Sequence, residues 1–349
     1  MTPRSSVSIA LTSYNGARYI GEQLESLAHQ TLPPAELIVC DDASTDGTLD
    51  IVNAFAAKAP FPVRAERNAE RLGYRSNFMK AAGLCRSELI AFCDQDDVWM
   101  PHKLAECVST FDNQDTLLTY HNASVTDAGL KPLGSLGSRA APRTINPPQS
   151  TDPWSYGLGF AIVFRRCLMD FIGLWPQSMD FNDARYNEAH DQWFFFLASS
   201  LGTIHYLAEP LALYRQHGAN TCGWHGRAAL LKNTVANLIG TGVGDLELRD
   251  RVAGKRADIL SRIAATAGGE RARRASAAAI GYRNLEARYR TRRALYLSNG
   301  ALSRMRQLAA FLFGGGYRSK KSWGVGSKAL VRDIFCAILF PVKTGTAGK

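Results

Sequence analysis

Three apolar stretches near the start of the chain each lead directly into a polar loop. They are residues 7–11, 37–40 and 89–92. Continuous apolar runs of this length, bounded by turn-forming residues, predict buried strands. After the first loop, Ile20, Leu24 and Leu27 recur at helical spacing, which predicts an amphipathic helix. The pattern therefore indicates strand, loop and helix units of an α/β fold.

The polar loops behind these predicted strands are expected to lie together in space. They occupy residues 12–15, 41–46 and 94–97. In open α/β sheets, ligands bind in the crevice beyond the carboxyl ends of the parallel strands. Because each loop follows a predicted strand, the sequence predicts a single ligand site to which all of them contribute.

The densest acidic segment is Asp94-Gln95-Asp96-Asp97, directly behind the third apolar stretch. Side chains alternate along an extended backbone, so Asp94 and Asp96 are expected to point to the same side. A divalent cation with oxygen ligands would relieve their mutual repulsion, and such ions commonly also hold substrate phosphates. A solvated acidic turn is the alternative. For Asp97 the favoured interpretation is the N-cap of a following helix.

Composition sets the scale of the fold. With 349 residues and 46% hydrophobic content, the chain can bury a core in one large domain with an appendage, or in two domains. No run approaches eighteen apolar residues, and the N-terminus enters a strand without an apolar signal region, so a cytoplasmic location is expected. The seven cysteines are scattered without Cys-x-x-Cys spacing, which favours reduced, mostly buried thiols over zinc ligands.

The net charge of +10 conceals two regions of opposite sign. Residues 1–224 carry 17 Lys and Arg against 24 Asp and Glu, a net charge of −7. Residues 225–349 carry 24 Lys and Arg against 7 Asp and Glu, a net charge of +17. A division of this kind indicates regions with different partners. We therefore predict a domain of residues 1–224 followed by a basic, mostly helical region, 225–349.

The C-terminal region carries the pattern of a basic amphipathic helix. Arginine is dense between residues 271 and 306. One helical face there would hold Tyr282, Leu285, Tyr289 and Tyr296. Two apolar segments, 308–313 and 334–340, are each flanked by Lys or Arg and are too short to span a bilayer. Such helices either lie at the surface of an anionic membrane or pack as a bundle on the first domain, and both interpretations stay open. Nucleic acid is not an expected partner, because the region lacks a recognisable module.

Several motifs follow one another in a fixed order along about the first 220 residues. They are Thr12-Ser13-Tyr14-Asn15-Gly16, Asp41-Asp42-Ala43-Ser44-Thr45-Asp46-Gly47, Asp94-Gln95-Asp96-Asp97, and His190-Asp191 ahead of an aromatic run. Together they resemble family 2 glycosyltransferases. The resemblance implies the GT-A fold, a Rossmann-like mixed sheet flanked by helices. It departs at Thr12, where many members carry proline, and at His190, where an acidic residue often precedes the catalytic aspartate.

The resemblance implies a metal and phosphate site. Asp96 would coordinate Mn²⁺ or Mg²⁺ directly, and Asp94 would complete the metal shell or contact the ribose of the donor. His217 would contact the metal or the pyrophosphate. Arg215 would neutralise a phosphate.

The resemblance also implies a nucleotide pocket. Asp41 and Asp42 would receive the nucleotide, with one carboxylate accepting the imino N–H of uracil or thymine. Thr12 and Tyr14 would line the pocket of the base. The donor-binding stretch between this pocket and the metal loop would include Gly73 and Asn77.

Asp191 is the catalytic base that the resemblance implies. An acceptor hydroxyl has a high pKa, so a positioned base must take its proton as the new bond forms. Local sequence alone favours helix capping for this residue, and its order behind the metal motif favours the base. A base opposite the leaving group gives a single displacement with inversion. His190 is assigned only to packing or exposure, and Gly157–Phe160 lies where the family places an acceptor-side glycine loop.

The implied activity is that of a metal-dependent, inverting glycosyltransferase. Its donor would be a UDP- or dTDP-linked sugar, and its acceptor a lipid-linked or growing surface glycan at the inner face of the cell membrane. The segment Asp94–Trp99 is most similar to a bacterial subgroup that builds O-antigen, capsule or exopolysaccharide and includes rhamnosyltransferases. A non-catalytic nucleotide-sugar binding or regulatory module and a nucleotidyltransferase are the alternatives.

Overall fold

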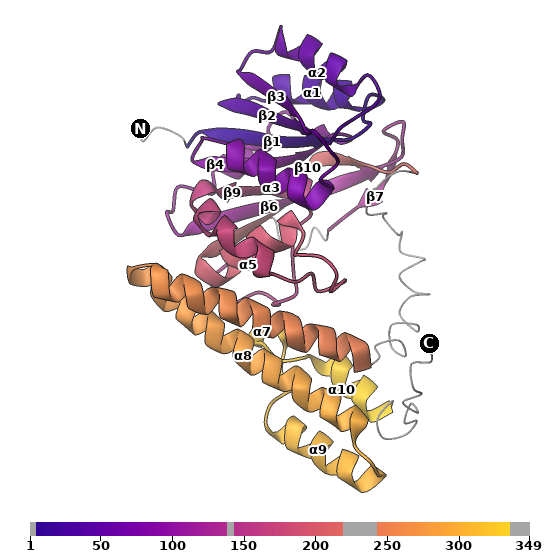
Figure 1. Ribbon diagram of the computed structural model, residues 1–349, viewed down its shortest axis with the longest axis vertical. Coiled ribbons are helices and arrows are strands. Elements are labelled where there is room, and N and C mark those ends of the chain that lie inside the picture. The colour runs from indigo at the N-terminus through magenta and orange to yellow at the C-terminus, as the bar shows by residue number, and fades with distance from the viewer. Residues whose placement is uncertain (1–4, 138–142, 219–242, 336–349) are drawn as a thin grey trace. The chain divides into compact units, whose positions relative to one another are not determined.

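The chain forms two compact units in a computed structural model that describes residues 5–137, 143–218 and 243–335 (Figure 1). The first unit draws on residues 1–148, 156–175 and 188–224. The second draws on residues 149–155, 176–187 and 225–349. Two short segments from the middle of the chain thus group with the C-terminal residues. Cys222, Cys336 and residues 336–340 of the predicted apolar segment lie outside the described residues.

A ten-stranded sheet organises the first unit. Its strands are β1 Val7–Ser13, β2 Glu36–Asp41, β3 Val63–Arg67, β4 Leu89–Asp94, β5 Val98–Trp99, β6 Thr116–Thr126, β7 Pro132–Ser135, β8 Arg143–Asn146, β9 Ile162–Arg165 and β10 Thr203–Arg215. Their order is β3-β2-β1-β4-β9-β6-β10-β5, with β7 beside β6 and β8 beside β10. β1 pairs in parallel with β2 and β4, whereas β9 is antiparallel to β4 and β6. The predicted mixed α/β sheet is confirmed.

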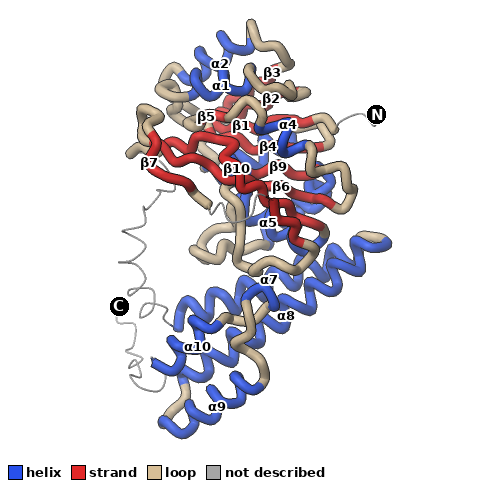
Figure 2. The backbone as a smooth tube through the Cα atoms, turned by 180° about the vertical axis from the view of Figure 1, so that it is seen from behind, coloured by secondary structure: helices blue, strands red, loops and turns tan. Residues whose placement is uncertain are grey.

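The helices of this unit cover both faces of the sheet. They are α1 Ile20–Ala28, α2 Thr48–Ala56, α3 Tyr74–Leu84, α4 Lys103–Val108 and α5 His190–Leu201, together with the 3₁₀ helices η1 Gly159–Ala161 and η2 Arg166–Gln177. α3 packs against β1, β2, β4 and α5. α3 and α5 lie on the face turned to the viewer in Figure 1, and α4 is seen on the opposite face in Figure 2.

Burial from both sides explains why the central strands are mostly apolar on both faces. In β1, Ile9 and Leu11 belong to a core cluster with Ile20 and Leu24 of α1. Ala10 points to the other face and is also fully buried. Strands covered on both faces read as continuous apolar runs rather than as alternating ones. The predicted strands and the first predicted helix are therefore where the sequence placed them.

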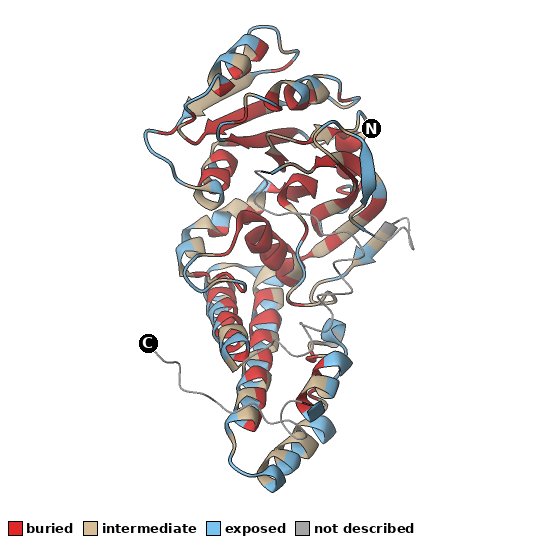
Figure 3. Cartoon of the chain, turned by 90° about the vertical axis from the view of Figure 1, so that its right-hand side faces the viewer, coloured by how far each residue is buried: buried red, intermediate tan, exposed pale blue. Residues whose placement is uncertain are grey.

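The second unit is helical in its described residues. Its helices are α7 Val243–Thr266, α8 Gly269–Leu297, α9 Ala301–Phe313, η3 Lys320–Ser322 and α10 Ser327–Asp333. Figure 3 shows buried positions along the sides that α7 and α8 turn toward each other. Tyr282, Leu285 and Tyr289 of α8 are buried. Tyr289 also accepts a 2.9 Å hydrogen bond from the Trp154 indole. This face of α8 packs inside the unit.

A buried ion pair ties α8 to α10 within the second unit. Arg292 donates to both carboxylate oxygens of Asp333, at 2.8 and 2.7 Å. The hydroxyls of Tyr296 and Tyr317 donate to the same carboxylate. These four contacts satisfy a charge that burial would otherwise penalise.

α9 presents apolar side chains to solvent. It contains no buried residue, and Leu302, Met305, Leu312 and Phe313 are exposed. Within the described residues, every helix is too short or too polar to cross a membrane. The described cysteines, Cys40, Cys85, Cys93, Cys107 and Cys167, are free thiols, as expected.

Candidate active site

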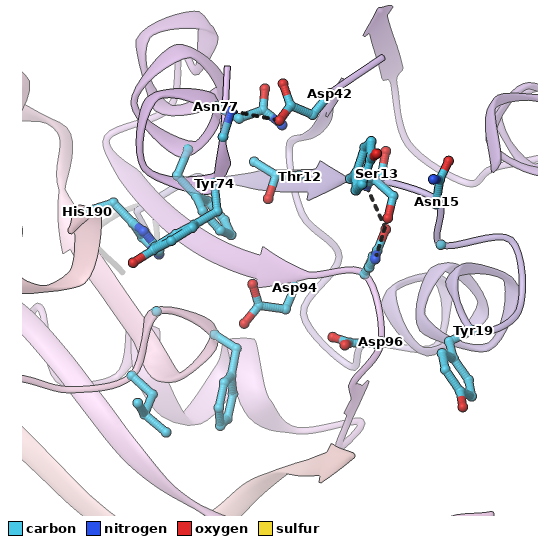
Figure 4. A pocket seen from close by; sticks show the side chains of 18 of the residues that line it. Thr12, Ser13, Asn15, Tyr19, Asp42, Tyr74, Asn77, Asp94, Asp96 and His190 are labelled. Atoms are coloured by element: carbon cyan, nitrogen blue, oxygen red, sulfur yellow. Dashed lines mark hydrogen bonds between the residues drawn. The ribbon is translucent and has the colours of Figure 1, made fainter. Parts of the chain in front are cut away.

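A cleft of about 990 Å³ lies at the carboxyl ends of β1, β2 and β4. Many of the predicted site residues line it, namely Thr12, Tyr14, Asp42, Gly73, Asn77, Asp94, Asp96, Asp191 and His217. Figure 4 shows Asp94, Asp96 and His190 around the same opening. The structure therefore brings the three predicted strand ends together in one site.

Gln95 fastens the loop after β1 to the loop after β4. Its Oε1 accepts the Tyr14 backbone N–H at 2.9 Å, and its Nε2 donates to the Tyr14 carbonyl at 3.1 Å. Gly16 makes room for this amide, because a Cβ at that position would lie 2.0 Å from Gln95 Oε1. The sequence pattern gave no sign of this link, since it joins residues 81 positions apart.

Asp96 and His217 meet across the cleft. The distance from His217 Nε2 to Asp96 Oδ2 is 2.8 Å, and both side chains are mostly buried. The His217 ring stacks on Tyr19, with ring centroids 4.7 Å apart. Because stacking fixes the orientation of the imidazole, His217 Nε2 and Asp96 Oδ2 are held close to each other in the cleft.

Asp94 is a strongly perturbed carboxyl group of the site. Burial, with the nearby charges of Asp96 and Asp191, raises its pKa to about 8 against the lowering effect of Lys103. The contribution of Asp191 places its charge close to Asp94. The cleft thus gathers more negative charge than its surroundings neutralise.

The charge and donor set of the cleft fit a divalent cation. Within the described residues, no three His, Cys, Asp or Glu side chains are gathered as a complete ligand set. Asp94, Asp96 and His217 offer carboxylate and imidazole donors, which suit Mn²⁺ and, for the oxygens, Mg²⁺. A cation would also offset the repulsion that raises the pKa of Asp94. Oxygens of a bound diphosphate would then complete the shell.

Asp191 lies in the first turn of α5 and is 9% exposed. Its Oδ1 accepts the N–H of Gln192 at 2.8 Å. Ala189 occupies the N-cap position, so Asp191 is not the N-cap residue, although its carboxylate does bond a backbone N–H of the first turn of α5. Asp191 lines the cleft at the start of α5, and the aromatic residues that follow are buried.

Asp42 shapes the wall of the cleft. Its Oδ1 accepts N–H groups from Asn68 and Leu72 at 2.9 and 2.7 Å, and its Oδ2 accepts that of Gly73 at 2.9 Å. Gly73 has φ of 77°, a conformation that favours glycine. Asn77 joins the network, because its Oδ1 accepts from Asn68 at 2.9 Å.

Two arginines that were not predicted from the sequence also line the cleft. Arg71 lies over the Tyr14 ring, with its guanidinium carbon 3.9 Å from the ring centroid. Arg18 lies near Tyr19, 5.1 Å from the centroid of that ring. Guanidinium groups bind phosphate well. Nothing in the local sequence marks either arginine, since each is placed by packing against a tyrosine.

Asp41 does not line the cleft, contrary to its predicted contact with the nucleotide. It is fully buried. Its carboxylate accepts from the Ser13 hydroxyl at 2.9 Å and from the Ser44 backbone N–H at 2.8 Å. As the last residue of β2, it points beneath the loop, and the next residue, Asp42, faces the opening.

Arg215 also lies outside the cleft lining, so its predicted contact with phosphate is not supported. It is 2% exposed and donates to the backbone carbonyls of Asp96 and Ala128, each at 2.8 Å. Its backbone N–H donates to Asp97 Oδ1 at 3.1 Å, which replaces the predicted N-cap role of Asp97. Arg215, the last residue of β10, thus holds the loop of residues 94–97 in place, and β10 pairs with β5 directly after that loop.

Sequence comparison places residues 8–166 in the family described as Glycosyl transferase family 2. The chain is 26% identical over 221 residues to an uncharacterized glycosyltransferase of Nostoc sp., a match that covers 61% of this chain and 66% of the relative. It is 26% identical over 224 residues to the dTDP-rhamnosyl transferase RfbG of Shigella flexneri, which covers 61% of this chain and 73% of RfbG. The matches span 60% to 66% of the length of the first curated relatives.

Among solved structures, S. aureus TarS in complex with UDP-GlcNAc resembles this chain with a TM-score of 0.51 at 16% sequence identity. The match covers 88% of this chain and 79% of the TarS chain. At this identity the likeness establishes the fold. The predicted GT-A type architecture, a mixed sheet flanked by helices and followed by a helical region, is confirmed.

Proposed function

We propose that this protein, whose residues 8–166 match the model of Glycosyl transferase family 2, is a metal-dependent glycosyltransferase that inverts the configuration of the sugar it transfers. One observation carries the proposal. A single cleft holds the acidic pair Asp94 and Asp96, the imidazole of His217 and the separate carboxylate of Asp191. These are the groups needed to bind a nucleotide diphosphate through a cation and to activate an acceptor.

Asp96, Asp94 and His217 would hold Mn²⁺ or Mg²⁺. When bound, the cation supplies positive charge that stabilises the diphosphate as it leaves the sugar. The protein keeps these ligands in place through neighbouring contacts. Arg215 holds the backbone of Asp96 from below, and Tyr19 stacks on His217. Such outer contacts fix the orientation of ligands before the ion binds.

Asp191 would act as the general base. The acceptor hydroxyl gives its proton to the Asp191 carboxylate while its oxygen forms a bond to the anomeric carbon. The bond from that carbon to the diphosphate oxygen breaks in the same step, and the diphosphate leaves with the electron pair. Attack from the face opposite the leaving group inverts the anomeric centre.

The donor would be a UDP- or dTDP-linked sugar, with its base near Thr12, Tyr14 and Asp42 on the cleft wall. Arg71, which lies over Tyr14, is placed to neutralise phosphate charge. The dTDP-rhamnosyl transferase RfbG is similar over 61% of this chain, which makes dTDP-rhamnose the first donor to test. The acceptor would be a lipid-linked or growing glycan in the synthesis of O-antigen, capsule or exopolysaccharide.

Donor hydrolysis and transfer, measured with and without Mn²⁺, test the roles. We expect Asp96→Asn to lose about 100-fold in metal-dependent turnover. Asp191→Asn should lose a factor on the order of 10² to 10⁴ while still binding the nucleoside diphosphate. Asp50→Asn is the matched control, because Asp50 is exposed on α2 and outside the cleft.

Full turnover in both cleft variants would reject this site. Donor binding without transfer to any glycan would favour a regulatory module. Release of pyrophosphate from a nucleoside triphosphate would favour a nucleotidyltransferase.

The basic region would hold the enzyme at the inner, anionic face of the cell membrane. Phe313 at the end of α9 is 88% exposed, and Leu302, Met305 and Leu312 are exposed on the same helix. Arg304 and Arg306 lie among them, and residues 225–349 carry a net charge of +17. Apolar side chains flanked by cations suit an anionic lipid surface, where each cation contributes about 1 kcal/mol.

Flotation with phosphatidylglycerol vesicles tests this location. Binding should exceed that to phosphatidylcholine vesicles and should weaken with salt. Replacing Leu312 and Phe313 by Gln should reduce it. Ile280→Gln is the control, since Ile280 is an exposed apolar residue of α8. Equal flotation of all variants would remove α9 from the proposal.

A further inference from the structure

His190 lies in the cleft directly before the proposed base, and its ring is almost fully enclosed. The residue is 5% exposed. Its ring stacks on Phe78, with centroids 3.9 Å apart, and meets Phe92 edge-on at 4.7 Å and Tyr74 at 6.2 Å. The cage itself requires only an aromatic ring, and phenylalanine would fill it equally well.

Both ring nitrogens of His190 are buried, and neither has a hydrogen-bond partner in the part of the chain that the structure describes. Buried polar groups are normally paired, so an unpaired one is costly and calls for a reason. Burial, assisted by the nearby charge of Arg75, lowers the pKa of His190 to about 3, so the ring is neutral at physiological pH. A neutral imidazole offers one donor and one acceptor.

Gly159 keeps the Nε2 edge of this ring clear of side chains. A Cβ at residue 159 would lie 2.3 Å from His190 Nε2. Gly159 and His190 both line the cleft, as does Tyr74 on the other side of the ring. No described residue uses the pairing capacity of the imidazole, and a ligand in the cleft would reach its enclosed nitrogens through a small shift of the residues around the ring.

We propose that His190 determines specificity for the transferred sugar by hydrogen bonding to one of its hydroxyl groups. The inference rests on the proposed function. Reacting atoms must come within about 3 to 3.5 Å of each other, so an acceptor hydroxyl activated by Asp191 places the sugar ring beside residue 190. A sugar hydroxyl both donates and accepts, which matches a neutral imidazole, and the flanking aromatic rings suit the C–H faces of a sugar.

The test compares His190→Phe, which keeps the aromatic packing, with His190→Gln, which restores a donor and an acceptor. His121→Phe is the matched control. His121 is also buried with an unpaired Nε2, but it does not line the cleft. The probes are dTDP-rhamnose, UDP-glucose and UDP-GlcNAc, each measured against dTDP or UDP alone in the presence of Mn²⁺.

For the preferred donor, we expect His190→Phe to lower both kcat/KM and the affinity of the nucleotide sugar about 10- to 100-fold. Affinity for the nucleoside diphosphate should change by about twofold or less. His190→Gln should recover part of the loss. Deoxy analogues of the sugar should identify the hydroxyl, because the analogue lacking it binds the parent and His190→Phe equally well. The melting temperature of His190→Phe should stay level or rise, since an unpaired polar group has been removed.

Unchanged affinity for the nucleotide sugar in His190→Phe would overturn the proposal. So would a parallel loss of affinity for the nucleoside diphosphate, which would mean that His190 supports the shape of the cleft. The ratio of the affinity for the nucleotide sugar to the affinity for the nucleoside diphosphate can be measured without any turnover. If the parent binds nucleotide sugars yet transfers nothing, the proposed function fails while the ratio still decides the role of His190.

Discussion

The link between Gln95 and Tyr14 predicts that Gly16→Ala destabilises the parent protein but stabilises a variant that lacks the Gln95 side chain. Gly16→Ala places a Cβ 2.0 Å from Gln95 Oε1 and 2.5 Å from its Cδ. The obstructing atoms belong to the end of a flexible side chain, so the amide should swing away rather than unfold the loop. In doing so it gives up both hydrogen bonds to the Tyr14 backbone.

The magnitude follows from two opposing effects. Each lost hydrogen bond costs about 0.5 to 1.5 kcal/mol, and these are near solvent, so together they cost about 1 to 2 kcal/mol. Replacing glycine by alanine at a compatible backbone conformation stabilises by about 0.4 to 1 kcal/mol, through the unfolded state. The φ of Gly16 is outside the positive region. In the parent, Gly16→Ala should therefore destabilise by up to about 1.6 kcal/mol.

In a Gln95→Ala background the obstruction and both bonds are already gone. The same Gly16→Ala change should then stabilise by about 0.4 to 1 kcal/mol. Denaturant unfolding of the parent, both single variants and the double variant gives the coupling directly. An equal effect of Gly16→Ala in both backgrounds would refute the reasoning, because it would mean that Gln95 is not what the new methyl group meets.

Further outcomes follow from other buried groups. Burial lowers the pKa of Lys103 to about 7; the folded state therefore sheds a proton that the unfolded state keeps up to about pH 10. The stability of the parent relative to Lys103→Met should rise between these pH values by at most about 1.4 kcal/mol per unit, and melting temperatures that differ by a constant amount would contradict this. Gly159→Ala should displace His190 and lower sugar-nucleotide affinity about tenfold with nucleoside diphosphate affinity intact; calorimetry showing equal losses would count against it. Asp333→Ala leaves Arg292 buried without its partner and should cost about 3 to 5 kcal/mol, whereas replacing both by Leu and Met should cost less in thermal unfolding.

The parts of the site that the sequence predicted are those determined by strand periodicity. β1, β2 and β4 are mostly apolar on both faces because helices cover both faces of the sheet, so their ends could be located from local sequence. Asp94 and Asp96 both line the cleft as predicted, but β4 ends at Asp94 and the turn that follows brings Gln95 to the cleft as well, so alternation along a strand is not the cause. Local patterns suffice to locate the strand ends, but not the direction of each side chain behind them.

Tertiary contacts decided the rest. Asp41 and Asp42 are adjacent aspartates, yet their carboxylates have different partners. Asp41 accepts hydrogen bonds from two serines, and Asp42 accepts them from the backbone of a distant loop. Arg215, at the end of β10, bonds the backbone of Asp96 in the loop of residues 94–97. Arg71 acquires its place from a ring more than fifty residues earlier. No local pattern reveals which of several polar residues a fold uses for its own support.

The meeting of Asp96 and His217 joins segments 121 residues apart in the chain. An ion held by both would act as a removable cross-link that closes a loop over about half of the first unit, present only when that unit is folded. The supply of free cation would then set resistance to heat and to proteases as well as turnover, by ordinary mass action. Without the cation, the protein would be degraded faster in the cell in addition to being inactive.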